Sequence, residues 1–219
     1  MMKTIYALWG VRDLLAADPA PRLAGAAAVQ ANIADAAVET AMLRISTFDA
    51  PVQAVVNVWW DGTPRPDAAQ RALSAVAERV VGWHVEEATP IPPPVTAVRV
   101  RAPGLSNIAF LRKPDDLSQA DWLDRWRNHH TAIAIETQAT FGYVQNVVIG
   151  PATAGAPDIA GIVEELFPIE ALTDPHAFYG SGGDAAELAR RIERLMTSVA
   201  TFGGDRNLDV VPTSRYRLR

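Results

Sequence analysis

A proline-rich segment divides the chain into two stretches that show the same series of hydrophobic patterns. The segment reads Ile91-Pro92-Pro93-Pro94. Consecutive prolines fit neither a helix interior nor a central strand, because each one fixes φ and removes a backbone donor. We therefore predict two halves, at residues 1–91 and 95–219, each close to the size of a small domain of about 100 residues.

Apolar periodicity predicts the elements of the first half. Alternating or continuous apolar runs indicate strands, and apolar residues three and four apart indicate helices. An Ala-rich run is typical of a helix, and a period-two run of a half-buried strand. The expected elements are a strand at 3–10, a helix at 20–34, strands at 37–47 and 52–60, a helix at 67–80 and a strand at 81–89.

The second half repeats that order. Its expected elements are a strand at 107–112, a helix at 118–140, strands at 142–149 and 159–167, a helix at 184–201 and a strand at 207–217. The order β-α-β-β-α-β is that of the ferredoxin-like unit. Its two helices cover one face of the sheet and leave the other bare, so we expect the bare faces of two units to pack together. The predicted fold is α+β, with two ferredoxin-like units in one chain forming a barrel of the dimeric α+β type, and substrate pockets are expected inside it.

Composition excludes several classes of partner and chemistry. The net charge is −5, and no Lys/Arg cluster is longer than two residues. Nucleic acids and anionic membranes attract basic surfaces, so neither is an expected partner. The chain has no cysteine, which excludes disulfides and thiolate chemistry. A predicted strand occupies the N-terminus in place of a signal peptide, and no apolar run approaches the roughly 20 residues of a membrane helix. We therefore expect a cytoplasmic protein.

Several uncommon residues follow one another in a set order between Phe110 and Val148. A strand ends in Arg112-Lys113-Pro114, the next helix carries Trp126 and His130, and the following strand begins Tyr143-Val144-Gln145-Asn146. This order resembles the signature of the EthD family of dimeric α+β barrels. One departure is Thr131-Ala132, where the family usually has Ala-Pro. The resemblance covers about 40 residues closely and extends more loosely to residue 217, and the first half looks like a diverged copy.

The resemblance implies a function. EthD-type proteins are typically free of cofactors and are often encoded beside genes for degrading organic compounds. We therefore expect a cofactor-independent catabolic enzyme without a bound metal, most simply a lyase-type catalyst of decarboxylation or elimination on a hydrophobic aromatic compound. The alternatives are a cofactor-free monooxygenase of an aromatic substrate and a non-catalytic ligand-binding accessory protein. Fold analogy does not choose among them. A homodimer is also possible.

The two adjacent histidines lie on opposite flanks of the predicted buried stripe of the helix at 118–140. His130 is the candidate general acid/base, which the family resemblance supports, and the alternative is a core histidine bound to a backbone carbonyl. His129 is expected at the surface or in a supporting role. Neighbouring helix positions diverge by about 100°, and Ile133 and Ala134 supply no ligand one turn on. A metal site at these histidines is therefore not expected.

Strand residues supply the candidate substrate-binding groups. Tyr143 and Gln145 share one face of their strand and could bind substrate oxygens, with Trp126 holding an aromatic ring. Glu164 and Glu165 face opposite sides of their strand, and whichever points inward would be a buried carboxylate of raised pKa. Glu165 is also a candidate substrate contact. The alternatives are a packing role for Tyr143 and a solvated edge for the glutamates.

The first half offers weaker candidates. Trp59 is a candidate ligand contact, although aromatic residues at strand parity are more often core. His84 shares a strand face with Glu86, at a spacing that could hold a proton or a substrate. Arg215 and Arg217 alternate with apolar residues and are expected on a solvated strand face. No Gly-rich phosphate loop, serine elbow or zincin motif is present in the sequence.

Overall fold

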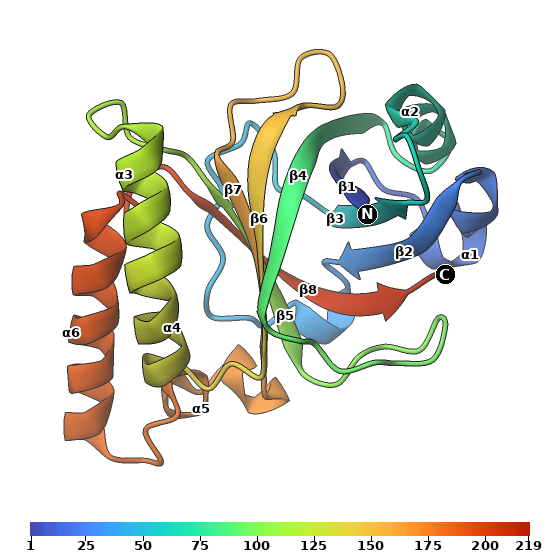
Figure 1. Ribbon diagram of the computed structural model, residues 1–219. Coiled ribbons are helices and arrows are strands. Elements are labelled where there is room, and N and C mark those ends of the chain that lie inside the picture. The colour runs from blue at the N-terminus through green and yellow to red at the C-terminus, as the bar shows by residue number, and fades with distance from the viewer.

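Eight antiparallel strands close on themselves in the computed structural model, which describes residues 1–219 (Figure 1). Their order around the barrel is β1-β3-β2-β8-β5-β7-β6-β4. The strands are β1 (Met2–Trp9), β2 (Ala26–Ile33), β3 (Ala54–Trp60), β4 (Arg79–Ile91), β5 (Leu105–Leu111), β6 (Gly142–Pro151), β7 (Gly161–Phe167) and β8 (Asp209–Arg217). Each half contributes four neighbouring strands, and the pairs β4–β6 and β2–β8 join the halves.

The helices lie outside the barrel. They are α1 (Leu14–Ala17), η1 (Ala20–Arg22), η2 (Ala36–Val38), α2 (Pro66–Ser74), α3 (Gln119–Leu123), η3 (Asp124–His130), α4 (Thr131–Thr137), η4 (Ile169–Leu172), α5 (Pro175–Tyr179) and α6 (Ala185–Thr201). Segments α3, η3 and α4 form one continuous rod beside α6 (Figure 1). The predicted α+β fold of two ferredoxin-like units is confirmed. No helix combines the length and the apolar character needed to cross a membrane.

The predicted helix at 20–34 is wrong. The short segments α1 and η1 take its place, and β2 begins at Ala26. Pro21 interrupts the helical run, and Gly25 turns the chain into the strand with a φ of 89°, a conformation that glycine adopts readily. The helix preference of alanine is worth less than about 1 kcal/mol per residue. Backbone pairing of β2 with β3 and β8 outweighs it.

The predicted strand at 37–47 is also wrong. These residues hold most of η2 and then a loop, whose only strand-like contact is a bridge between Ile45 and Val210. Because β2 already occupies the place beside β3, the sheet offers this segment no partner strand along its length. The elements of the second half agree with prediction to within a few residues.

Each sheet is buried on both faces. One set of side chains from every strand points into the barrel, where Trp9, Trp83 and Phe110 form an apolar cluster around Phe48, with ring centroids 5.4–5.8 Å apart. The other set points outward, beneath the helices. On the second sheet the outward cluster includes Trp122 of the helical rod. The barrel is thus an inner layer surrounded by two separate helix-covered layers.

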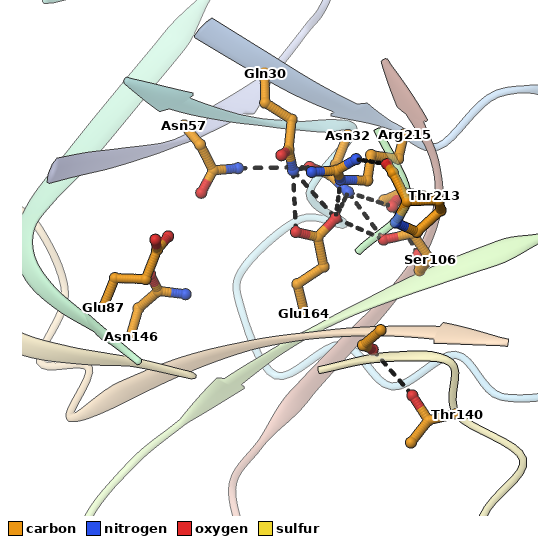
Figure 2. A network of polar contacts seen from close by, with 12 residues as sticks. Gln30, Asn32, Asn57, Glu87, Ser106, Thr140, Asn146, Glu164, Thr213 and Arg215 are labelled. Atoms are coloured by element: carbon orange, nitrogen blue, oxygen red, sulfur yellow. Dashed lines mark hydrogen bonds and ion pairs between the residues drawn. The ribbon is translucent and has the colours of Figure 1, made fainter. Parts of the chain in front are cut away.

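The other end of the barrel interior is polar (Figure 2). The carboxylate of Glu164 accepts hydrogen bonds from Asn32 Nδ2 at 2.8 Å, from Ser106 Oγ at 3.0 Å and from Gln30 Nε2 at 3.0 and 3.1 Å. Arg215 Nε lies 3.2 Å from Glu164 Oε1 as an ion pair, without hydrogen-bond geometry. The expectation that Arg215 faces solvent is therefore wrong, because β8 closes the barrel and turns this side chain inward.

Two tryptophans of the helical rod depend on a glycine in the sheet. A Cβ added to Gly161 would lie 2.7 Å from Trp126 Cη2 and 3.0 Å from Trp122 Cη2, and both indoles are almost fully buried. We predict that Gly161→Ala lowers the free energy of unfolding by about 1–3 kcal/mol, because a tightly packed core resists added volume. Urea denaturation of the variant and the wild type measures this change in the free energy of unfolding.

The matched control is Gly150→Ala in β6, where no atom lies within 4 Å of the added Cβ. Its stability should change by no more than about 0.5 kcal/mol. Equal effects of the two substitutions would contradict this account of how the rod packs on the sheet.

Candidate active site between the second sheet and its helices

Three polar side chains form one row across the helix-covered face of the second sheet. Asn107 of β5 pairs with Glu165 of β7, which in turn pairs with Tyr143 of β6. Residues opposite each other in antiparallel strands have Cβ atoms about 5 Å apart. Val163 and Phe167, which share the parity of Glu165, pack in the apolar clusters beneath the helices. The row therefore faces the helices and not the barrel interior.

Glu165 is an acidic group that forms no ion pair or hydrogen bond within the protein, although Tyr143 and Tyr179 lie near its carboxylate. Burial raises its pKa to about 7, and no nearby charge or hydrogen bond offsets that rise. The Oδ1 atom of Asn107, on the neighbouring strand, is buried without a hydrogen-bond partner. Buried polar atoms are normally paired, so each exception calls for an explanation. A carboxyl group that is half protonated near neutral pH can give or take a proton from a molecule bound beside it.

A series of polar groups leads away from Glu165. Burial raises the pKa of Tyr143, and the Glu165 carboxylate adds to the rise, while the nearby side chains of Gln145, Thr131 and Trp126 oppose it. Gln145 Nε2 donates a hydrogen bond to Thr131 Oγ1 at 2.9 Å. Thr131 Oγ1 donates in turn to the backbone oxygen of Trp126 at 3.2 Å. Glu165, Tyr143, Gln145 and Thr131 thus form a polar series within an otherwise apolar layer.

The series ends at a groove of about 730 Å³ between the helical rod and the end of β4. Its lining residues are Ala88, Thr89, Pro90, Ala120, Leu123, Asp124, Arg127, Asn128, Thr131 and Gln145. Ligand pockets usually measure about 300–1,000 Å³. The groove is therefore large enough to admit an aromatic molecule to the outer end of the polar series.

A wide turn shapes the helical rod above this layer. Segment η3 is a π-helix, and π turns recur at functional sites. A π turn takes more residues than the 3.6 of an α turn, so positions four apart stay in line. Four buried residues of the rod follow that spacing, at Trp122, Trp126, His130 and Ala134, and Thr137 is buried one turn further on. The regular helix assumed from sequence had placed His130 on a flank of the stripe.

His130 lies between the rod and α6. Its side chain is 7% exposed, its Nδ1 is 3.0 Å from Ser198 Oγ, and its ring centroid is 4.8 Å from that of Phe202. Burial lowers the pKa of His130 to about 4, so the ring is neutral near pH 7. No contact joins it to the polar series, and a general acid/base role for His130 stays a prediction.

The structure brings together half of the predicted site residues and separates the rest. Trp126, Tyr143, Gln145 and Glu165 share the helix-covered layer. His129 is exposed, with Nδ1 3.4 Å from Asp124 Oδ2. In the first half, Trp59 lies at the polar end of the barrel, with Lys3 Nζ 4.5 Å from its ring centroid, and His84 is half-buried on the outer face. A role of these three residues in binding a substrate stays a prediction.

Sequence reasoning missed Asn107 and Thr131. A polar residue inside the apolar run Leu105–Leu111 was the available signal for Asn107. The place of Asn107 beside Glu165 follows only from the register between β5 and β7. The place of Thr131 beside Gln145 follows only from the course of the helical rod. No three His, Cys, Asp or Glu side chains are grouped as metal ligands would be, and metal analysis of the purified protein remains the test of the prediction that it binds none.

We predict that Glu165→Gln changes the pH dependence of stability. The pKa of Glu165 is about 7 in the folded protein, above its usual 4.5. The folded state therefore keeps a proton that the unfolded chain releases, and the wild type loses stability as pH rises between these values. Glutamine does not titrate, so the variant should gain about 1–3 kcal/mol relative to wild type across this interval.

Chemical denaturation at pH 4.5–8 measures the difference, with the exposed Glu39→Gln as control. A difference between the Glu165 variant and wild type that stays constant with pH would contradict the raised pKa.

His130→Gln should show the opposite trend. The pKa of His130 is about 4 when folded and 6.5 as its ordinary value, so the unfolded chain binds a proton that the folded protein does not. Wild type therefore loses stability as pH falls from 6.5 to 4, and the variant is spared that loss. Titration of the ring by NMR checks the cause directly, with His129→Gln used to assign the signals. A His130 pKa near 6.5 would exclude this environment.

Comparisons with known proteins support the fold. No protein-family model matches the sequence, and no curated protein matches it. An anthrone oxidase-like protein of known structure superposes with a TM-score of 0.57 at 9% identity, covering 99% of this chain and 93% of that one. A chlorite dismutase variant from Candidatus Nitrospira defluvii gives 0.52 at 10% identity, covering 99% and 91%. At such low identity these likenesses establish a shared fold over the full length; membership of the EthD family is not shown.

Proposed function

We propose that this chain is an enzyme that oxidises an electron-rich aromatic compound with molecular oxygen, and that Glu165 takes a proton from the substrate. The observation that carries the proposal is the Glu165 carboxyl, whose pKa of about 7 arises from burial alone. A base is most effective when its pKa lies near the working pH. Structural likeness to an anthrone oxidase-like protein supports an oxidation at the level of the fold only.

The reaction requires a substrate that becomes electron-rich on losing a proton. A CH₂ group between aromatic rings and beside a conjugated carbonyl has this property. The Glu165 carboxylate removes the proton, the resulting carbanion passes an electron to O₂, and the two radicals combine to a hydroperoxide. Loss of water then leaves a carbonyl, so that CH₂ + O₂ gives C=O + H₂O. One oxygen atom enters the product and the other leaves as water.

The neighbours of Glu165 have matching roles. The Tyr143 hydroxyl, whose pKa burial raises, remains protonated and can donate a hydrogen bond to the substrate oxygen on which negative charge develops. Asn107 supplies a further polar contact from the adjacent strand. Trp122 and Trp126 pack above the sheet, with ring centroids 4.8 Å apart, and form the buried apolar layer beside which the polar series lies.

A lyase-type reaction is the second proposal. The same carboxylate could take or return the proton of a decarboxylation or an elimination, and such a reaction needs no O₂. His130 stays the candidate acid/base from sequence, although its pKa of about 4 and its contact with Ser198 favour a role in holding the rod against α6. A ligand-binding protein without turnover is the third alternative.

Oxygen uptake tests the proposal. Anthrone supplied to the purified protein should cause O₂ consumption that persists after chelation, with kcat/KM rising through a pKa near 7 as Glu165 ionises. We predict that Glu165→Gln lowers turnover by about 10²–10⁴-fold, the usual share of a general base.

Glu164→Gln is the matched control, because Glu164 is the next residue of β7 and faces the barrel interior. The Glu164→Gln substitution should lower stability, while each folded molecule should keep most of the wild-type turnover rate. His130→Gln should retain activity if the ring is structural. Equal losses in the two glutamate variants would contradict a site in the helix-covered layer. Turnover without O₂ would favour the lyase.

A further inference from the structure

The groove beside the polar series contains one cation without an ionic partner. Arg127 lies in η3, is half-buried and lines the groove. Its guanidinium forms neither an ion pair nor a hydrogen bond within the protein. Arg112 is bound by Asp209, and Arg194 by Glu136. The five N–H donors of the planar Arg127 guanidinium therefore have no hydrogen-bond acceptor within the chain.

The only acidic residue of the groove is already engaged. Asp124 Oδ1 accepts a hydrogen bond from Asn128 Nδ2 at 2.9 Å, and its Oδ2 lies 3.4 Å from His129 Nδ1. The remaining lining residues are uncharged. The guanidinium of Arg127 is therefore the only positive charge among the lining residues that a molecule entering this groove would meet.

We propose that Arg127 binds a carboxylate on the substrate, so that the enzyme acts on aromatic acids. The proposal rests on the proposed function in assuming that the substrate enters through this groove. A guanidinium binds a carboxylate through two parallel hydrogen bonds. Partial burial in the groove screens such a pair less than open solvent does.

The spacing along the rod suits this class of molecule. Arg127 and Thr131 are four residues apart, so they lie on the same side of the rod, about one turn apart. A fused aromatic ring system is large enough to reach from one of these side chains to the other. A carboxylate at Arg127 would place the ring over Thr131 and Gln145, and its far edge toward Tyr143 and Glu165.

Binding of naphthoate and its neutral analogue naphthamide, measured by calorimetry on the whole protein, tests the proposal without turnover. The wild type should bind naphthoate about tenfold more tightly, which corresponds to about 1.4 kcal/mol. Arg127→Gln should abolish the preference, and Arg127→Lys should retain part of it. The matched control Arg12→Gln, at an exposed position of the first half, should leave it unchanged. Added salt should reduce it.

Ala120→Trp, which fills the groove from the exposed first turn of α3, should weaken binding of both probes and so locate the site. Equal affinity of the two probes for wild type, no binding of either, a preference that survives Arg127→Gln, or binding unaffected by Ala120→Trp would each overturn the proposal. A lasting naphthoate preference with no oxygen uptake would overturn only the proposed oxidation. Oxygen uptake without a preference for naphthoate would overturn the role of Arg127 and leave the proposed oxidation standing.

Discussion

Backbone pairing between the two halves determines most of what the structure can do. Strand β4 pairs with β6, and β2 with β8, so that two four-stranded sheets become one barrel without a free edge. Closure buries the inner face of each sheet, and the helices bury the outer face. A polar side chain in the middle of a strand therefore points either into the barrel or toward the outer layer, and its parity decides between them.

Glu164 and Glu165 show how far these two environments differ. They are adjacent in β7, yet Glu164 meets two amides, a hydroxyl and a guanidinium inside the barrel. Glu165 lies beneath the helices near Tyr143 and Tyr179, without an ion pair or a hydrogen bond, and burial raises its pKa to about 7. The first carboxylate is compensated and so stabilises one conformation of the barrel interior. The second is uncompensated, which is the condition for proton transfer.

The second half could largely be predicted from sequence because its amphipathic patterns agree with its structure. The helix at 184–201 carries a capping Asp184 and a stripe through Leu195, and the structure has α6 at Ala185–Thr201. The first half misled prediction where local preference and pairing disagree. An Ala-rich segment became β2 because neighbouring strands supplied the hydrogen bonds that a helix would have formed internally.

The candidate site was harder to predict. Periodicity shows that Tyr143 and Gln145 share a face, but not which face the helices cover, because both faces are buried in a closed barrel. For the same reason Arg215 appeared to be a surface residue. The π turn added a further error, since a helical wheel assumes a regular helix and places His130 on the flank of the buried stripe that it joins. Only the register between strands brings Asn107, Glu165 and Tyr143 into one row.

Closure within a single chain has one more consequence. In a barrel built from two identical chains, symmetry requires both helix-covered layers to be alike, so any group placed in one for chemistry is also present in the other. Here the layers have separate sequences. The first is filled by a continuous apolar cluster around Leu8, Leu23 and Leu73, whereas the second contains the unpaired carboxyl and the groove. Because the two units belong to one polypeptide, their layers can differ. The first layer can consist of stabilising apolar contacts, while the second contains polar groups that lower stability.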